Sequence, residues 1–153
     1  MKKSVKHYWV FDDWKYWKAQ LYQESRFKTD ALSPVGASGL AQFMPRTWRA
    51  VAKRLNYEKY SPKIPKYAIY AGAFYMRQQW NMWSSPRPQL DRLFLAQASY
   101  NAGAGNIIKA QKECNMASTY EGIIECLPKV TGHHSKETIT YTKRIKRWRL
   151  LLD

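Results

Sequence analysis

The sequence predicts an all-α or mostly α protein that folds as a single globular domain over residues 1–153. Apolar side chains recur at helical spacing along most of the chain, and no apolar–polar alternation extends beyond four residues. Clusters of proline and glycine separate the periodic segments. With 45% hydrophobic residues, a chain of 153 residues has enough apolar material for one core, which excludes a disordered protein.

The first predicted helix covers residues 11–27, and its apolar face carries Trp17 and Leu21. Asp12 and Asp13 fall in its expected first turn. Carboxylates are favourable there because the N-terminal end of a helix carries partial positive charge.

Proline and capping residues place the remaining helices. Pro45 is expected in a first turn, where its fixed φ suits the helix and its missing N–H is not needed. Ser118 and Glu121 have the spacing of a capping box, which predicts a short helix after Ser118. After a loop over 29–39, the expected helices are 45–55, 67–83, 89–100, 106–113, 119–126 and 135–152.

The net charge of +15 draws the protein toward polyanions, among them nucleic acid, anionic lipid and cell-envelope polymers. A solvated basic surface explains the charge equally well. The sequence contains no run of 18 apolar residues, so it predicts no membrane-spanning helix. The first residues lack the apolar core of a secretory signal, so we expect synthesis in the cytoplasm without a signal peptide. Cys114 and Cys126 fit either a disulfide or two reduced thiols, and we expect no metal site.

Glu24 is the residue that most clearly indicates a catalytic function. It follows Leu21 by three positions and Trp17 by seven, so it projects from the apolar side of the first predicted helix. Burial there would disfavour the ionised form and raise its pKa, as a general acid near neutral pH requires. The alternative is a solvated helix end, with Glu24 paired to Arg26 or Lys28.

Three later segments supply what a carbohydrate cleft uses. Residues 39–45 combine apolar side chains with an amide, and residues 98–103 end a helix with Tyr100 and Asn101. Residues 137–141 bring a further tyrosine on an apolar helix face. Amides and hydroxyls between apolar walls are typical of sites that orient a small ligand such as a sugar.

At these residues the chain resembles the catalytic domain of the soluble lytic transglycosylases, the lysozyme-like SLT family that includes many phage endolysins. The segments similar to its motifs, in order, are Glu24-Ser25 for the Glu-Ser pair, residues 36–47 for G-x-x-G-L-M-Q-x-M-P-x-T, residues 99–103 for A-Y-N-A-G and residues 137–141 for E-T-x-x-Y. Ala41 stands where the family usually has Met, and Ser99 where it usually has Ala. Both changes are expected to alter the width and contacts of the cleft.

The resemblance implies a lysozyme-like fold of the goose type, with a central substrate cleft and no cofactor or metal. It assigns Glu24 as the catalytic acid and base, and Ser25 as the neighbour of the sugar's N-acetyl group. The residues expected to bind substrate are Ser25, Gln42, Phe43, Met44, Tyr100, Asn101 and Tyr141. Glu137 is expected to be a structural ion-pair partner.

The activity implied is cleavage of the MurNAc-β-1,4-GlcNAc bond of peptidoglycan without water, leaving 1,6-anhydroMurNAc ends. A glycosidase normally uses two carboxylates. Here only Asp30 offers a nearby second one, which favours a mechanism with one carboxylate. The alternatives are a hydrolytic goose-type lysozyme that uses Asp30 or another acid, a cationic membrane-permeabilising protein and a nucleic-acid-binding protein.

Peptidoglycan glycan strands are the expected partner of a monomeric protein, and nucleic acid is not expected, because no nucleic-acid-reading motif is present. The helix at 135–152 is basic on its outer faces and could contact anionic envelope polymers or lipid; otherwise it is a core helix with a solvated back. Without a signal peptide, we expect a phage lysis protein or virion-associated enzyme that acts on the bacterial cell wall.

Overall fold

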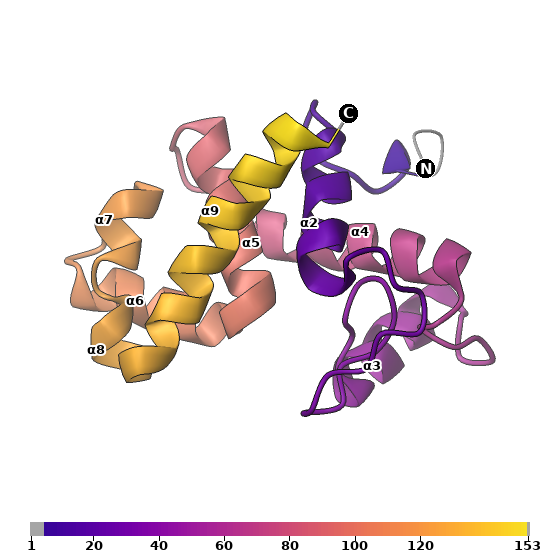
Figure 1. The fold of residues 1–153 in the computed structure, drawn as a ribbon. Coiled ribbons are helices and arrows are strands. Elements are labelled where there is room, and N and C mark those ends of the chain that lie inside the picture. Colours follow the sequence, from indigo (N-terminus) through magenta and orange to yellow (C-terminus); the bar gives the residue numbers. More distant parts are fainter. Residues whose placement is uncertain (1–4, 153) are drawn as a thin grey trace. The chain divides into compact units, whose positions relative to one another are not determined.

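The computed structural model describes residues 5–152. Regular structure in this range consists of helices (Figure 1), together with isolated β-bridges at Leu32–Ser38 and Ser38–Phe43. The all-α class predicted from the sequence is therefore confirmed. None of the helices in the described range is both long and apolar enough to span a membrane.

The chain forms two compact units. The first contains Met1–Arg77 and Ile145–Asp153, and the second contains Gln78–Arg144. The helices are, in order, α2 (Lys15–Ser25), α3 (Pro45–Leu55), α4 (Pro65–Met82), α5 (Gln89–Ala102), α6 (Ala104–Glu113), α7 (Tyr120–Ile124), α8 (Leu127–Thr131), the 3₁₀ turn η1 (Gly132–His134) and α9 (Ser135–Leu151). The boundaries between the units fall inside α4 and inside α9, so each of these two helices has residues in both units.

Helix α2 begins at Lys15, later than the sequence predicts. Asp13 precedes the helix, and its Oδ1 accepts a hydrogen bond from the Lys15 backbone N–H at 3.1 Å. Its Oδ2 accepts a charge-assisted hydrogen bond from Arg149 Nε. Asp13 thus bonds the N–H of the first residue of α2 from a position before the helix, and Trp14 is the N-cap.

In the first unit, the core forms where α2 packs on the first part of α4. Trp17 and Leu21 are fully buried, as the apolar spacing predicts. The indole of Trp17 lies over Gly72, where an added Cβ would come within 2.5 Å of the ring atom Cζ2. Gly72 is therefore needed for the two helices to approach this closely. Beside it, Gln20 Nε2 donates to Met76 Sδ at 3.3 Å.

Proline begins both α3 and α4. Pro45 occupies the first turn of α3, as predicted. Pro65 begins α4, two residues before the start that the apolar spacing predicts. Trp48 on α3 donates its Nε1–H to the Tyr60 carbonyl at 3.2 Å and so holds the connection between the two helices.

The second unit has its own core, built from α5, α6, α7 and α8. Trp83, directly after α4, donates its Nε1–H to Ser99 Oγ at 2.9 Å. The buried core residues are Trp83, Leu95, Ala98, Ile107, Ala110, Ile123, Ile124 and Leu127.

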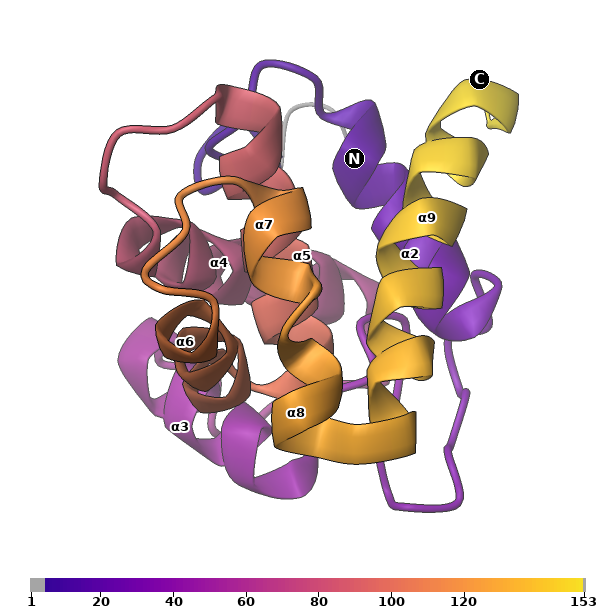
Figure 2. The ribbon, with the colours of Figure 1, turned by 90° about the vertical axis from the view of Figure 1, so that its left-hand side faces the viewer.

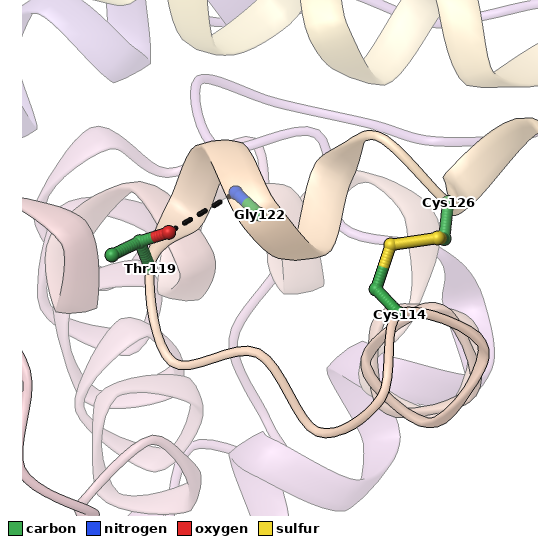
Figure 3. Close-up of a disulfide and its surroundings, with 4 residues drawn as sticks. All are labelled: Cys114, Thr119, Gly122 and Cys126. Atoms are coloured by element: carbon green, nitrogen blue, oxygen red, sulfur yellow. Dashed lines mark hydrogen bonds between the residues drawn. A yellow bond between two sulfur atoms is a disulfide. The ribbon is translucent and has the colours of Figure 1, made fainter.

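Helix α7 is shorter than predicted, and its N-cap is Thr119 rather than Ser118. Thr119 Oγ1 accepts a hydrogen bond from the Gly122 backbone N–H at 3.1 Å (Figure 3). The capping-box pattern places the cap one residue too early, because serine and threonine are adjacent and both can cap. A separate helix, α8, follows with proline in its first turn.

Cys114 and Cys126 form a disulfide, which decides between the two states that the sequence leaves open. It joins the C-cap of α6 to the N-cap of α8, with their Cα atoms 5.7 Å apart. The loop that it closes contains α7 (Figure 3). The bond therefore ties three helices of the second unit together through the chain itself.

Substituting Gly72→Ala should destabilise the protein, because the new methyl group overlaps the buried indole of Trp17. Overpacking of this kind costs about 1–3 kcal/mol in free energy of unfolding. Urea denaturation measures the loss.

Gly105→Ala is the matched control. Gly105 lies in α6, and a Cβ added there would meet no other atom within 4 Å. Alanine favours helix over glycine, so stability should be unchanged or slightly increased. Equal loss in both variants would contradict the role given to Gly72.

Replacing both Cys114 and Cys126 with alanine should lower the free energy of unfolding by about 3 kcal/mol, because the bond closes a short loop in the unfolded chain. Thermal or urea unfolding measures this change. Wild type treated with dithiothreitol should unfold at the same midpoint as the double variant. A reductant that leaves the midpoint unchanged would show that the cysteines are not bonded in solution.

Candidate active site

Glu24 and Ser25 are the last two residues of α2, in the first unit. Glu24 is partly buried and Ser25 is buried. Ser25 Oγ donates to the Leu21 carbonyl at 3.1 Å, one turn earlier in the same helix. The hydroxyl proton of Ser25 is therefore engaged within the helix, so its oxygen could serve a ligand only as a hydrogen-bond acceptor.

The chain turns sharply directly after this pair. Arg26 and Phe27 both have positive φ, at 54° and 61°. Left-handed backbone costs about 1–3 kcal/mol for each residue with a side chain, and it persists only where surrounding contacts hold it. The backbone N–H of Arg26 donates to the Tyr22 carbonyl at 2.8 Å, which closes the helix. The position of Glu24 thus depends on a turn that contacts from other residues must stabilise.

Gln42 has a positive φ of 49° and uses its amide N–H groups within its own loop. Its Nε2 donates to the carbonyls of Ala31 at 3.3 Å and Gly39 at 3.0 Å. These bonds join both ends of the loop over residues 31–39. Any contact between Gln42 and a glycan would therefore use the amide oxygen Oε1.

Phe43 and Met44 face different surroundings. Phe43 is only 2% exposed, and its ring packs against Trp48 and Tyr75 with centroids 5.2 and 6.1 Å away. Its backbone pairs with Ser38, which turns the side chain inward. We therefore interpret Phe43 as a core residue, contrary to its predicted contact with substrate. Met44 is 41% exposed and is accessible to a ligand.

In the second unit, Asn101 on α5 bonds to Glu137 and Thr138 in the first turn of α9. Thr138 Oγ1 donates to Asn101 Oδ1 at 2.8 Å. Asn101 Nδ2 donates to Glu137 Oε1 at 3.4 Å. Tyr141 follows Thr138 by one turn and is buried. Asn101 thus links α5 to α9 through hydrogen bonds.

Two sequence-based interpretations change here. Glu137 is expected to form an ion pair, whereas the structure shows that it accepts a hydrogen bond from the Asn101 amide. Ser99 is fully buried and accepts the hydrogen bond of the Trp83 indole, so it does not line a cleft. The sequence pattern assigns no role to Thr138, although this residue is the threonine of the E-T-x-x-Y segment. Only its bond across to α5 reveals its function.

The predicted site residues divide between the two units: Glu24, Ser25, Gln42, Phe43 and Met44 belong to the first, and Tyr100, Asn101 and Tyr141 to the second. A surface pocket of about 310 Å³ in the first unit contains none of them, since it is lined by residues between Val5 and Trp14. Within residues 5–152, no cluster of three His, Cys, Asp or Glu side chains could hold a metal ion.

The described residues form an all-α fold, and Glu24 and Ser25 are at the end of α2. The family model of the Transglycosylase SLT domain matches residues 12–123. The chain belongs to this family. Glu24, Ser25 and the segment ending in Asn101 lie inside the matched range, whereas Thr138 and Tyr141 lie beyond it.

Curated relatives carry the name membrane-bound lytic murein transglycosylase F. The protein from Shewanella sediminis is 32% identical over 111 residues, which cover 72% of this chain and 22% of the relative. The protein from Cellvibrio japonicus is 38% identical over 99 residues, covering 65% of this chain and 19% of the relative. The chain thus spans about a fifth of the length of these relatives.

Solved structures of soluble lytic transglycosylases have the same fold. The 70 kDa enzyme of Escherichia coli matches 97% of this chain and 23% of its own, with 26% identity and a TM-score of 0.73. An inactive Glu-to-Gln mutant of lytic transglycosylase Slt from Pseudomonas aeruginosa matches 98% of this chain and 22% of its own, with 26% identity and a TM-score of 0.76.

Thr138→Val should destabilise the second unit by about 1 kcal/mol, because it removes the donor to Asn101 and leaves the shape of the side chain unchanged. Urea denaturation measures the difference. Thr140→Val on the same helix is the control and should change stability by less than half as much. If the two variants were equally stable, the bond between Thr138 and Asn101 would not be holding the helices.

Proposed function

We propose that the chain is a peptidoglycan lytic transglycosylase, which cleaves the MurNAc-β-1,4-GlcNAc bond and leaves 1,6-anhydroMurNAc ends. The observation that carries the proposal is the Glu24-Ser25 pair, at the end of a buried helix and inside the range matched by the SLT family. The names of the curated relatives, which describe lytic murein transglycosylases, support the same activity.

Glu24 acts in both halves of the proposed reaction. As an acid it protonates the glycosidic oxygen while the bond from this oxygen to C1 of MurNAc breaks. The resulting carboxylate then takes the proton of the C6 hydroxyl of the same MurNAc, whose oxygen forms the new bond to C1. Glu24 ends protonated, as it began, and no water is consumed. Because the nucleophile is part of the substrate, the second step is intramolecular, which gives it a large entropic advantage.

The remaining residues orient the glycan and require no cofactor. Ser25 is proposed to accept the N–H of the acetamido group, whose own oxygen can stabilise positive charge at C1. Gln42 would contribute its amide oxygen and Met44 an apolar contact, in keeping with the free positions of these groups in the loop. Tyr100, Asn101 and Tyr141 are proposed to contact the sugar.

The competing chemistry is hydrolysis by a goose-type lysozyme, in which Asp30 would direct water to C1. Asp30 is exposed in the loop after α2, with no described contact that would aim it at a substrate. The exposure favours the one-carboxylate route. Mass spectrometry of the released muropeptides separates the two, because anhydro ends lack one water for each bond cut.

We further propose that the basic end of α9 helps to hold the enzyme near anionic envelope polymers or lipid. The side chains of Lys143, Arg144, Lys146 and Arg147 are exposed. An exposed cationic surface attracts anionic polymers over a distance set by the ionic strength. The monomeric state and the origin as a phage lysis protein stay predictions from the sequence.

Glu24→Gln should lower the rate of glycan cleavage at least about a hundredfold, because the amide cannot donate the required proton. Glycan binding should be retained, since the side chain keeps its size. Release of soluble muropeptides from purified sacculi measures cleavage, and co-sedimentation with sacculi measures binding. Glu58→Gln, which changes an exposed carboxylate of the same unit, is the control and should keep full activity. A Glu24→Gln variant with a tenth of wild-type activity would refute the assignment.

A further inference from the structure

Trp148 on α9 contacts the residues on both sides of Glu24. Its Nε1–H donates to Gln23 Oε1 at 2.9 Å. Its ring meets Tyr22 edge to face, with centroids 5.0 Å apart. Figure 2 shows the end of α9 running beside α2, and both segments belong to the first unit.

Arg26 completes this contact from the other side of Glu24. Its guanidinium carbon lies 4.6 Å from the ring centroid of Tyr22 and 4.7 Å from that of Trp148. Cations over the face of an aromatic ring are attracted by the ring's quadrupole. Phe27 also packs on Tyr22, at 5.2 Å between centroids. The two left-handed residues after Glu24-Ser25 are therefore both held by aromatic contacts.

A second bond fixes the same part of α9 to the other end of α2. Arg149 follows Trp148 and pairs with Asp13, whose carboxylate also bonds the N–H of the first residue of α2. Neighbouring side chains of α9 thus hold residues before the start and near the end of the helix that carries Glu24. An ordinary core tryptophan would be buried among apolar side chains, whereas Trp148 is partly buried and its described partners are Gln23, Tyr22, Arg26 and Arg147.

We propose that Trp148 is a positioning residue for Glu24, because it holds Gln23 by a hydrogen bond and Arg26 by its ring face, and so fixes the backbone on both sides of the acid. The inference rests on the proposed transglycosylase activity. It adds to that activity a residue outside the range matched by the family model, which ends at residue 123.

The test separates the two contacts with two variants of the full chain. Trp148→Phe keeps a ring for Arg26 and Tyr22 but loses the donor to Gln23, and Trp148→Leu loses both. Soluble, uncrosslinked glycan strands serve as the substrate. Misplacement of a catalytic group by a small distance lowers the chemical rate strongly, so Trp148→Leu should lower kcat about tenfold or more and leave KM within a factor of about two. Trp148→Phe should recover part of the lost kcat.

A second measurement does not depend on activity. Hydrogen exchange of the backbone amides of residues 25–28 should be faster in Trp148→Leu than in wild type, because the turn loses its external contacts. Leu150→Ala is the control, since Leu150 is 73% exposed on the same turn of α9 and should change neither exchange nor kcat.

Each outcome decides one of the two hypotheses. An active wild type with unchanged kcat or unchanged exchange in Trp148→Leu would overturn the positioning role alone. A fall in kcat that Trp148→Phe does not reduce, together with an equal loss in Leu150→Ala, would point to general destabilisation and overturn it as well. A wild type that cleaves no glycan, although exchange at residues 25–28 responds as expected, would refute the proposed function itself.

Discussion

The packing of Trp17 on Gly72 is the constraint on which the first unit depends. The indole fills the space that a side chain on α4 would occupy, so α2 can pack here only because position 72 is glycine. Helix α2 is thereby fixed along one side and carries Glu24 and Ser25 at its end. Everything proposed for the acid follows from a rigid helix that stops at a defined residue.

The end of that helix is held differently from its middle. Arg26 and Phe27 both have left-handed backbone and reverse the direction of the chain after Ser25. This conformation is unfavourable for residues that have a side chain. Contacts from Tyr22 and Trp148 compensate for the strain, so the candidate site draws on a helix more than a hundred residues away in the chain. In the second unit the bond between Asn101 and Thr138 has the same character, because it joins the end of α5 to α9. Residues that resemble substrate-binding positions of the family thus also hold the scaffold.

Much of the fold can be predicted from local patterns. Apolar spacing locates the helices and the buried faces of Trp17 and Leu21, and Pro45 marks the start of α3. The errors arise where two local signals compete. The pattern puts Asp13 inside α2 although it bonds the first residue of the helix from outside, and it favours Ser118 over its neighbour Thr119. The motif assigns Phe43 to substrate, but its backbone pairing with Ser38 turns the ring into the core.

The sequence by itself determined the helical class, the charge and the candidate acid, because periodicity, composition and short motifs are properties of neighbouring residues. Tertiary structure alone decided that Cys114 bonds to Cys126, that Ser99 accepts the hydrogen bond of the Trp83 indole, and that Trp148 donates one to Gln23. These contacts join residues at least 12 positions apart in the chain. Their formation depends on how the helices pack, and no local spacing encodes that.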